Sequence, residues 1–280
     1  MIQMGKLICR LRKQKKMTQK ELAEGIVSEA VMSRIENGIV EPELLVLHAL
    51  FGRLGKTLHP FEIVVSNREY EDLKKRSDDV KMQTVVIAEG DYFKDIRKAM
   101  GLSQEKFSSD VYARETISNI EHGRTPQRKK MKNMLAKQGT VLEKYYGYVV
   151  SVEYDVYEWV EQYREMVKNG AEEASGMLSQ IRKRLEDFNP VNQQFLESSE
   201  LMMKKRVGEI SVGEELAALE KCLRYTMPEY DGFLYRIPHR QENVILEEIL
   251  SCMKSLQRTE AARILEEEVR KKNEKKLKLS

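Results

Sequence analysis

The sequence predicts an all-α fold, and three observations lead to this prediction. The 280 residues include only 15 Gly and 6 Pro, so few turns are available to separate strands. Apolar residues in the second half of the chain recur at the spacing of one helix face. A segment near the N-terminus is repeated further along, and each copy carries signals that start and stop short helices. Together these features indicate small helical bundles followed by a longer helical domain.

The repeat relates residues 17–38, MTQKELAEGIVSEAVMSRIENG, to residues 102–123, LSQEKFSSDVYARETISNIEHG, at a constant offset of 85 residues without a gap. The identical pairs are Gln19/Gln104, Ser33/Ser118, Ile35/Ile120, Glu36/Glu121 and Gly38/Gly123, with Arg12/Arg97 upstream. Chance does not keep such a register, so the two segments are expected to fold alike.

Each copy predicts two short helices joined by a tight connection. The hydroxyl groups of Thr18 and Ser103 can cap the first helix of each copy. Gly38 and Gly123 can end the second helix, because glycine readily adopts the left-handed conformation of a helix C-terminus. Preceding helices at 4–15 and 92–100, and closing helices at 43–54 and 128–137, would complete two bundles. Each bundle therefore contains a predicted helix-turn-helix.

The second helix of each motif combines an apolar stripe with a polar face. The expected inward residues are Ile26, Val31 or Met32, and Ile35 in the first copy, and Val111, Ile117 and Ile120 in the second. The outward residues are Glu29, Ala30, Ser33, Arg34 and Asn37 in the first copy, and Arg114, Glu115, Ser118, Asn119 and His122 in the second. Short polar side chains on an exposed helix suit a nucleic-acid groove.

The segment LRKQKKMTQKELAEGIVSEAVMSRIENG resembles the Cro/CI-type (Xre-type) helix-turn-helix domain, through the T-Q that opens the first motif helix and the S-R-I-E-N-G that closes the second. The resemblance covers about 4–64 and, in the second copy, about 92–148. The short connection at 23–28, of the form E-G-I-x-S, is similar to that of Rgg/PlcR-type peptide-responsive regulators, and residues 216–241 resemble their C-terminal helical array. The implied fold is tandem helix-turn-helix bundles followed by a short tetratricopeptide-like helical-repeat domain.

The resemblance also implies a set of residues that contact double-stranded DNA. In this domain type the second motif helix enters the major groove, while the start of the first motif helix and the loop after the second contact phosphates. The corresponding residues are Gln19, Ser28, Glu29, Ala30, Ser33, Arg34 and Asn37 in the first copy, and Gln104, Arg114, Glu115, Thr116, Ser118, Asn119, His122 and Arg124 in the second. Arg114 can pair with guanine and Asn119 with adenine. A homodimer and a small effector peptide are further partners that the resemblance implies.

Some charged residues have a structural explanation. A carboxylate near phosphates is repelled, so Glu36 and Glu121 are expected to pair with Arg12 and Arg97 instead of contacting DNA. Segments 6–20 and 124–137 contain basic but no acidic residues, which predicts two basic faces despite a net charge of only +3. Lys129, Lys130 and Lys132 belong to the second of these, where a solvated face and a phosphate contact are both left open.

No catalytic chemistry is predicted. The four histidines lack metal-ligand spacing, the three cysteines lie far apart, and no glycine-rich phosphate loop is present. We therefore expect no catalytic residue, no metal and no cofactor, and the chain is not expected to be an enzyme. No run of 18 apolar residues occurs, so no membrane contact and a cytoplasmic location are expected.

The predicted domains are a helix-turn-helix domain at 1–65, a linker helix at 66–88, a second helix-turn-helix-like domain at 89–148, and a helical-repeat effector or dimerisation domain at 149–280. The aromatic residues Tyr157, Trp159, Tyr163 and Phe188 are expected in the core of the last. The leading hypothesis is a sequence-specific DNA-binding transcriptional regulator whose C-terminal domain mediates dimerisation and peptide sensing. The alternative is a protein-interaction scaffold with a degenerate helix-turn-helix and a partner-binding helical repeat.

Overall fold

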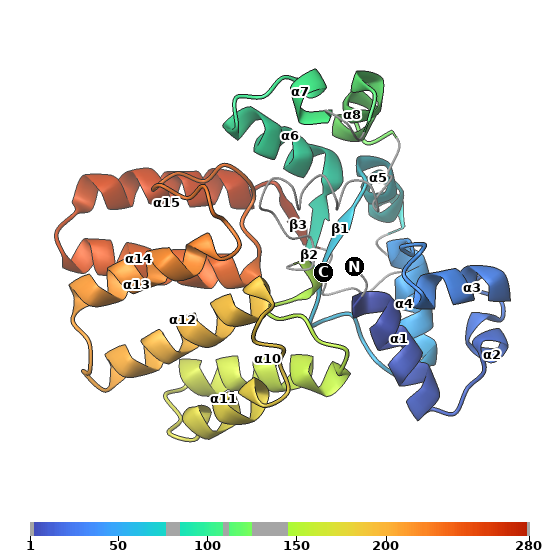
Figure 1. Ribbon diagram of the computed structural model, residues 1–280, viewed down its shortest axis with the longest axis horizontal. Coiled ribbons are helices and arrows are strands. Elements are labelled where there is room, and N and C mark those ends of the chain that lie inside the picture. Colours follow the sequence, from blue (N-terminus) through green and yellow to red (C-terminus); the bar gives the residue numbers. More distant parts are fainter. Residues whose placement is uncertain (1–2, 77–84, 109–111, 125–144, 279–280) are drawn as a thin grey trace.

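The computed structural model describes residues 3–76, 85–108, 112–124 and 145–278. Helices make up most of this part of the chain, which confirms the predicted all-α class. Figure 1 shows two small helical units at the right and top, a longer helical domain at the left and bottom, and a short sheet between them.

The first unit contains helices α1 (Gln3–Gln14), α2 (Gln19–Ala23), α3 (Glu29–Glu36) and α4 (Leu44–Arg53). The predicted helices 4–15 and 43–54 are therefore confirmed to within a residue or two. The apolar faces of these helices meet in one core, which contains Leu7, Ile8, Leu22, Met32, Ile35, Leu47 and Phe51.

The second unit repeats the first three of these helices as α6 (Glu89–Ala99), α7 (Gln104–Ser108) and α8 (Arg114–Glu121). The predicted inward residue Val111 and the closing helix predicted at 128–137 lie outside the described residues. The core of this unit contains Tyr92, Phe93, Ile96, Phe107, Ile117 and Ile120, and it also includes Tyr145 and Ile237 from later in the chain. The second unit is thus packed onto the C-terminal domain.

Two glycines show that the repeat extends into the first helix of each unit. A Cβ atom built on Gly5 of α1 would lie 2.2 Å from the carbonyl oxygen of Ile35 in α3. A Cβ atom built on Gly90 of α6 would lie 2.9 Å from the carbonyl oxygen of Ile120 in α8. These residues are related by the same 85-residue offset, so both units need glycine where two helix backbones meet.

The sheet contains three short strands that the sequence analysis did not predict. Strand β1 (Glu62–Val65) follows the first unit, and β2 (Val85–Ala88) directly precedes the second. They pair in parallel, with Glu62 opposite Val85, and β3 (Lys276–Lys278) pairs antiparallel to β2. Both β1 and β2 are rich in β-branched residues, which favour strands.

The predicted linker helix at 66–88 therefore needs correction. Its first part is helical, as α5 (Asn67–Lys75), but 85–88 form a strand because they hydrogen-bond to β1. Nor is the segment a purely exposed spacer, because Leu73 of α5 is buried in the same core as the first unit.

The C-terminal domain consists of α10 (Tyr154–Lys168), α11 (Ala174–Arg182), α12 (Pro190–Arg206), α13 (Val212–Arg224), α14 (Arg240–Ser255) and α15 (Thr259–Asn273). Consecutive helices pack against each other, as Figure 1 shows, which agrees with the six helices expected here. Tyr157 and Tyr163 are buried and Trp159 is half-buried. The expectation for Phe188 is wrong: its side chain is 78% exposed, because it lies beyond the end of α11 in the loop before α12.

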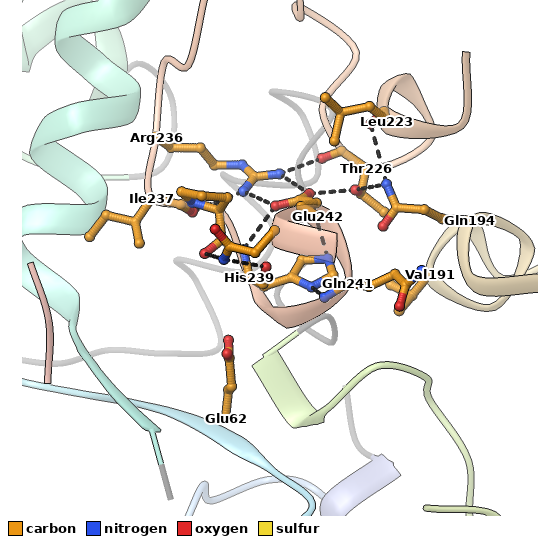
Figure 2. A network of polar contacts seen from close by, with 12 residues as sticks. Glu62, Val191, Gln194, Leu223, Thr226, Arg236, Ile237, His239, Gln241 and Glu242 are labelled. Atoms are coloured by element: carbon orange, nitrogen blue, oxygen red, sulfur yellow. Dashed lines mark hydrogen bonds and ion pairs between the residues drawn. The ribbon is translucent and has the colours of Figure 1, made fainter. Parts of the chain in front are cut away.

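A buried polar network stabilises the segment between α13 and α14 (Figure 2). The Arg236 and Glu242 side chains are both 0% exposed and form a bidentate ion pair of 2.5 and 2.7 Å. Thr226 donates its hydroxyl proton to the same carboxylate at 2.5 Å, and Gln194 donates to Thr226 at 2.8 Å. The two terminal nitrogens of Arg236 also donate to the carbonyl oxygens of Ile237 and Thr226, at 3.0 and 2.8 Å, whereas its buried Nε has no partner among the described residues. A buried charge pair is costly unless its polar atoms are hydrogen-bonded, and these contacts satisfy most of them.

This network lies beside the second unit. The ring of Tyr145 lies 6.3 Å from that of His239 on one side and 5.0 Å from that of Tyr92, in α6, on the other. At a half-buried position, Asp95 of α6 forms ion pairs with Lys272 at 3.1 Å and Lys275 at 2.8 Å. An apolar contact and an electrostatic one therefore both attach α6 to the C-terminal domain.

We predict that Gly5→Ala lowers the free energy of unfolding by about 3 kcal/mol, because the added methyl group overlaps the α3 backbone and α1 must move away. The matched control is Gly52→Ala in α4, where an added Cβ meets nothing within 4 Å. That substitution should be neutral or stabilising by about 0.5 kcal/mol, since alanine is the better helix former. Urea unfolding measures both, and equal effects at the two positions would contradict the close approach of α1 and α3.

Candidate nucleic-acid interface

The first motif helix of each unit begins at the predicted cap. The hydroxyl oxygen of Thr18 accepts from the backbone nitrogen of Glu21 at 3.1 Å, and the Glu21 carboxylate accepts from the backbone nitrogen of Thr18 at 2.6 Å. In the second unit, the hydroxyl oxygen of Ser103 accepts from the backbone nitrogen of Lys106 at 3.2 Å. Both caps confirm the interpretation of the sequence.

The second motif helices, α3 and α8, both end at the predicted glycines, but their N-terminal ends differ from each other. Gly38 and Gly123, at their C-terminal ends, have φ values of 66° and 71°. The hydroxyl oxygen of Ser28 caps α3 by accepting from the backbone nitrogen of Val31 at 3.3 Å. The equivalent residue before α8 is Ala113, which has no side-chain oxygen to do this.

A buried carboxylate fixes the end of α3 against α1 and α2. Arg12 of α1 donates two hydrogen bonds to Glu36, at 2.6 and 2.8 Å, and a third to the carbonyl oxygen of Met17 at 2.8 Å. Gln19, at the start of α2, donates from Nε2 to Glu36 at 2.7 Å. We call this arrangement of arginine, glutamate and glutamine the clamp.

The second unit contains the same clamp at the 85-residue offset. Arg97 donates two hydrogen bonds to Glu121, and a third to the carbonyl oxygen of Leu102 at 3.0 Å. Gln104 donates from Nε2 to Glu121 at 2.9 Å. The expectation that Glu36 and Glu121 pair with Arg12 and Arg97 is confirmed.

The clamp also determines the ionisation of these carboxylates. Burial raises the pKa of Glu36, but the hydrogen bonds from Arg12 and Gln19 lower it by more than burial raises it. The pKa of Glu36 therefore lies below its ordinary value. The same balance of burial against the hydrogen bonds from Arg97 and Gln104 lowers the pKa of Glu121. Both side chains are therefore anions that hold their unit together near neutral pH.

The predicted face of α3 lies on the surface. Ser28, Glu29, Ala30, Arg34 and Asn37 are exposed, and Ser33 is half-buried. Asn37 folds back and donates to the carbonyl oxygen of Ser33 at 2.9 Å. Within the described part of the chain, the Arg34 guanidinium makes no hydrogen bond or ion pair, so its donors face solvent.

The corresponding face of α8 is also accessible. Arg114, Glu115, His122 and Arg124 are exposed, whereas Thr116, Ser118 and Asn119 are half-buried. The His122 ring nitrogen Nδ1 lies 2.6 Å from the carbonyl oxygen of Ser118. Among the described residues, nothing pairs with the Arg114 side chain. Figure 1 places α3 and α8 at the periphery, away from the C-terminal helices α12 to α15.

Exposed basic residues lie on and between the first two helices of the first unit, α1 and α2. Lys6, Lys13, Lys16 and Lys20 are all exposed, in agreement with the basic face predicted for 6–20. Arg10, in the same run, pairs with Glu153 at 3.2 Å and so belongs to the contact with the C-terminal domain. The other predicted basic face falls outside the described residues except for Arg124.

Three contributors to this arrangement were not predicted from the sequence. Gly5 and Gly90 follow the 85-residue offset, so extending the repeat upstream would have found them. Ile237, which completes the core of the second unit, is separated from it by more than a hundred residues and leaves no local signal.

The described residues offer no sign of a metal centre or a membrane segment. No group of three or more His, Cys, Asp or Glu side chains within them could hold a metal ion. None of their helices is both long enough and apolar enough to span a bilayer.

We predict that Glu36→Gln lowers the free energy of unfolding at pH 7 by about 3 kcal/mol, because Arg12 loses its counter-ion in a half-buried site. The lowered folded pKa of Glu36 stabilises the wild type above the unfolded pKa of about 4.3, and this contribution is lost as pH falls through the folded pKa. Denaturant titrations from pH 7 to about pH 3 should therefore give a shallower pH dependence for the variant. Glu24→Gln, at an exposed site, is the control and should match the wild type; identical slopes for all three proteins would contradict the clamp.

Comparison with known proteins gives two findings. Residues 10–61 match the helix-turn-helix family, and this range includes α2, α3 and α4 of the first unit. The chain is also similar to PlcR in the crystal structure of Bacillus thuringiensis PlcR in complex with the peptide PapR7 and DNA. That likeness has 17% sequence identity, a TM-score of 0.32, and coverage of 98% of this chain and 95% of the other, and at this TM-score it supports no conclusion by itself. The sequence matches none of the curated proteins.

The family match, the capped helices and the clamp agree on one description. Residues 10–61 form a helix-turn-helix domain, and α6, α7 and α8 repeat the first three helices of the first unit.

Proposed function

We propose that this chain is a sequence-specific DNA-binding transcriptional regulator. The observation that carries the proposal is the match of residues 10–61 to the helix-turn-helix family, together with an exposed polar face on α3. The equivalent face of α8 is exposed as well, so both units offer a helix to a duplex.

In the proposed complex, α3 and α8 enter the major groove and their exposed residues contact base edges. The Arg114 guanidinium has the planar fork that pairs with the O6 and N7 atoms of guanine, a contact that contributes about 1–3 kcal/mol of base discrimination. Asn119 would pair with adenine in the same way, and the exposed carboxylates of Glu29 and Glu115 can accept from the amino group of cytosine.

Phosphate contacts would come from the exposed lysines of the first unit and from the start of each first motif helix. Such contacts supply affinity for any sequence and weaken as salt concentration rises. Gln19 and Gln104 lie at these helix starts, where the clamp holds their side chains in place before DNA binds.

The C-terminal helical domain is proposed as the regulatory half of the molecule. Its attachment to α6 through Tyr145, Ile237 and the Asp95 ion pairs supports this assignment, because a change in the C-terminal helices would be transmitted to the second unit. Homodimerisation and a peptide effector stay predictions from the resemblance, and a cytoplasmic location stays a prediction from the apolar pattern of the sequence.

The proposal is tested with a duplex selected by the full chain from a random library, using fluorescence anisotropy at two salt concentrations. Arg114→Ala should weaken binding to the selected duplex about 10-fold and reduce the preference for one base pair, because a bidentate base contact is lost. Lys20→Ala should weaken selected and unrelated duplexes alike, because it removes a phosphate contact.

The matched control is Arg263→Ala, an exposed arginine on α15 that lies in the C-terminal domain. It should leave binding unchanged. Equal effects of the Arg114 and Arg263 substitutions, or the absence of any duplex preference in the wild type, would overturn the proposal.

A further inference from the structure

Helix α5 contacts both units at once. At its N-terminal end, Asn67 packs against Gly123, the second residue after α8: a Cβ built on Gly123 would lie 2.3 Å from the Asn67 Cβ. In the first turn of α5, the Glu69 carboxylate accepts a hydrogen bond of 2.5 Å from the backbone nitrogen of Leu44, the first residue of α4. A single short helix thus touches the second unit with one side chain and the first unit with another.

Two neighbouring tyrosines form a second connection. The Tyr145 ring is buried in the core of the second unit, 5.0 Å from the ring of Tyr92. The next residue, Tyr146, donates its hydroxyl proton to the carboxylate of Glu41, in the loop between α3 and α4. These two adjacent residues therefore contact different units, Tyr145 the second and Tyr146 the first.

The sheet provides a third connection. Strand β1 leaves the first unit, β2 enters the second, and the two pair over four residues in parallel register. Figure 1 shows these strands between the units. Three independent contacts restrict translation and rotation of one unit relative to the other, so α3 and α8 are held in one fixed relation.

The exposed polar faces of α3 and α8, which we call the reading faces, are not copies of each other. At the 85-residue offset, Glu29 corresponds to Arg114, Ala30 to Glu115, Arg34 to Asn119 and Asn37 to His122. Of the exposed or half-buried positions on this face, Ser33 and Ser118 are the identical pair. The fold of the two units is the same, but the donors and acceptors they present to bases differ, so they are suited to different sequences.

We propose that one chain reads an asymmetric bipartite DNA site, with α3 on one block and α8 on a different block at a single fixed spacing. The inference rests on the proposed function and adds the form of its target. A homodimer that used one unit from each chain would instead read two identical blocks related by two-fold symmetry.

The rigid connection has a measurable consequence. Binding of the first block places the second unit at a high local concentration, but only at the spacing that the structure fixes. Inserting five base pairs rotates one block by about half a turn of the duplex, so that both units can no longer bind. We expect this insertion to weaken binding about 100-fold, to the affinity of one block alone.

The test begins with selection of duplexes by the full chain from a random library, followed by sequencing. The expected result is two different conserved blocks separated by one spacer length, with one chain per duplex by sedimentation. A single conserved block, two inverted copies of one block bound by two chains, or a variable spacer would each overturn the inference while leaving the proposed function intact. Failure to select any duplex would overturn the proposed function itself and the inference with it.

A pair of variants tests the connection directly. Glu69→Ala/Tyr146→Phe removes the two hydrogen bonds that α5 and Tyr146 make to the first unit. Each block alone should still bind as in the wild type, but a spacer changed by one base pair should now cost less than about 3-fold in affinity.

The control is Glu71→Ala/Tyr225→Phe, which removes an exposed carboxylate of the same helix and a hydroxyl between α12 and α13. It should keep the strict spacing requirement of the wild type. Relaxed spacing in the control, or unchanged spacing in the first variant, would contradict the role assigned to these contacts.

Discussion

The buried carboxylate of the clamp is the interaction on which the helix-turn-helix units depend. Glu36 is the last residue of α3 and Glu121 is the last residue of α8. Each is held by an arginine from the first helix of its unit and a glutamine from the second. A single residue thereby joins three helices, α1, α2 and α3 in the first unit and α6, α7 and α8 in the second. Burial makes each of its hydrogen bonds count for more than at the surface. The clamp thereby fixes the orientation of α3 and α8 within their units, and in the proposed complex with DNA this lowers the entropic cost of binding.

Beyond the units, the arrangement of the whole chain restrains how they can move. The first unit shares its core with α10, α11 and α12, while the second completes its core with Tyr145 and Ile237. The Arg236–Glu242 network stiffens the segment that carries Ile237, since both charges are buried and can separate only at high cost. An event in the C-terminal helices therefore has a direct physical route to α8, whereas α3 is reached through a different part of the core.

Much of this structure could be predicted because its signals are local or periodic. The caps at Thr18 and Ser103, the glycine ends of α3 and α8, and the pairing of Glu36 with Arg12 all follow from an alignment of the sequence with itself. The sheet could not be predicted, since β1 and β2 are four-residue segments that become strands only by pairing across a long separation. Phe188 was misassigned because helical periodicity continues past the residue where α11 ends. The polar faces of α3 and α8 are exposed or half-buried, as the apolar periodicity predicted, but their contact with DNA stays a prediction.

The central claim is that the two helix-turn-helix units form one rigid pair, and a distance measurement between them tests it most directly. Lys13 and Lys98 are equivalent by the repeat, exposed, and located on α1 and α6. Spin labels can be placed at these two positions after Cys9→Ser, since Cys222 and Cys252 are buried. Pulsed electron–electron double resonance should then give one narrow distribution of the distance between the two labels, and this distribution should be the same with and without duplex DNA. A broad or multi-peaked distribution in the free protein would contradict the account.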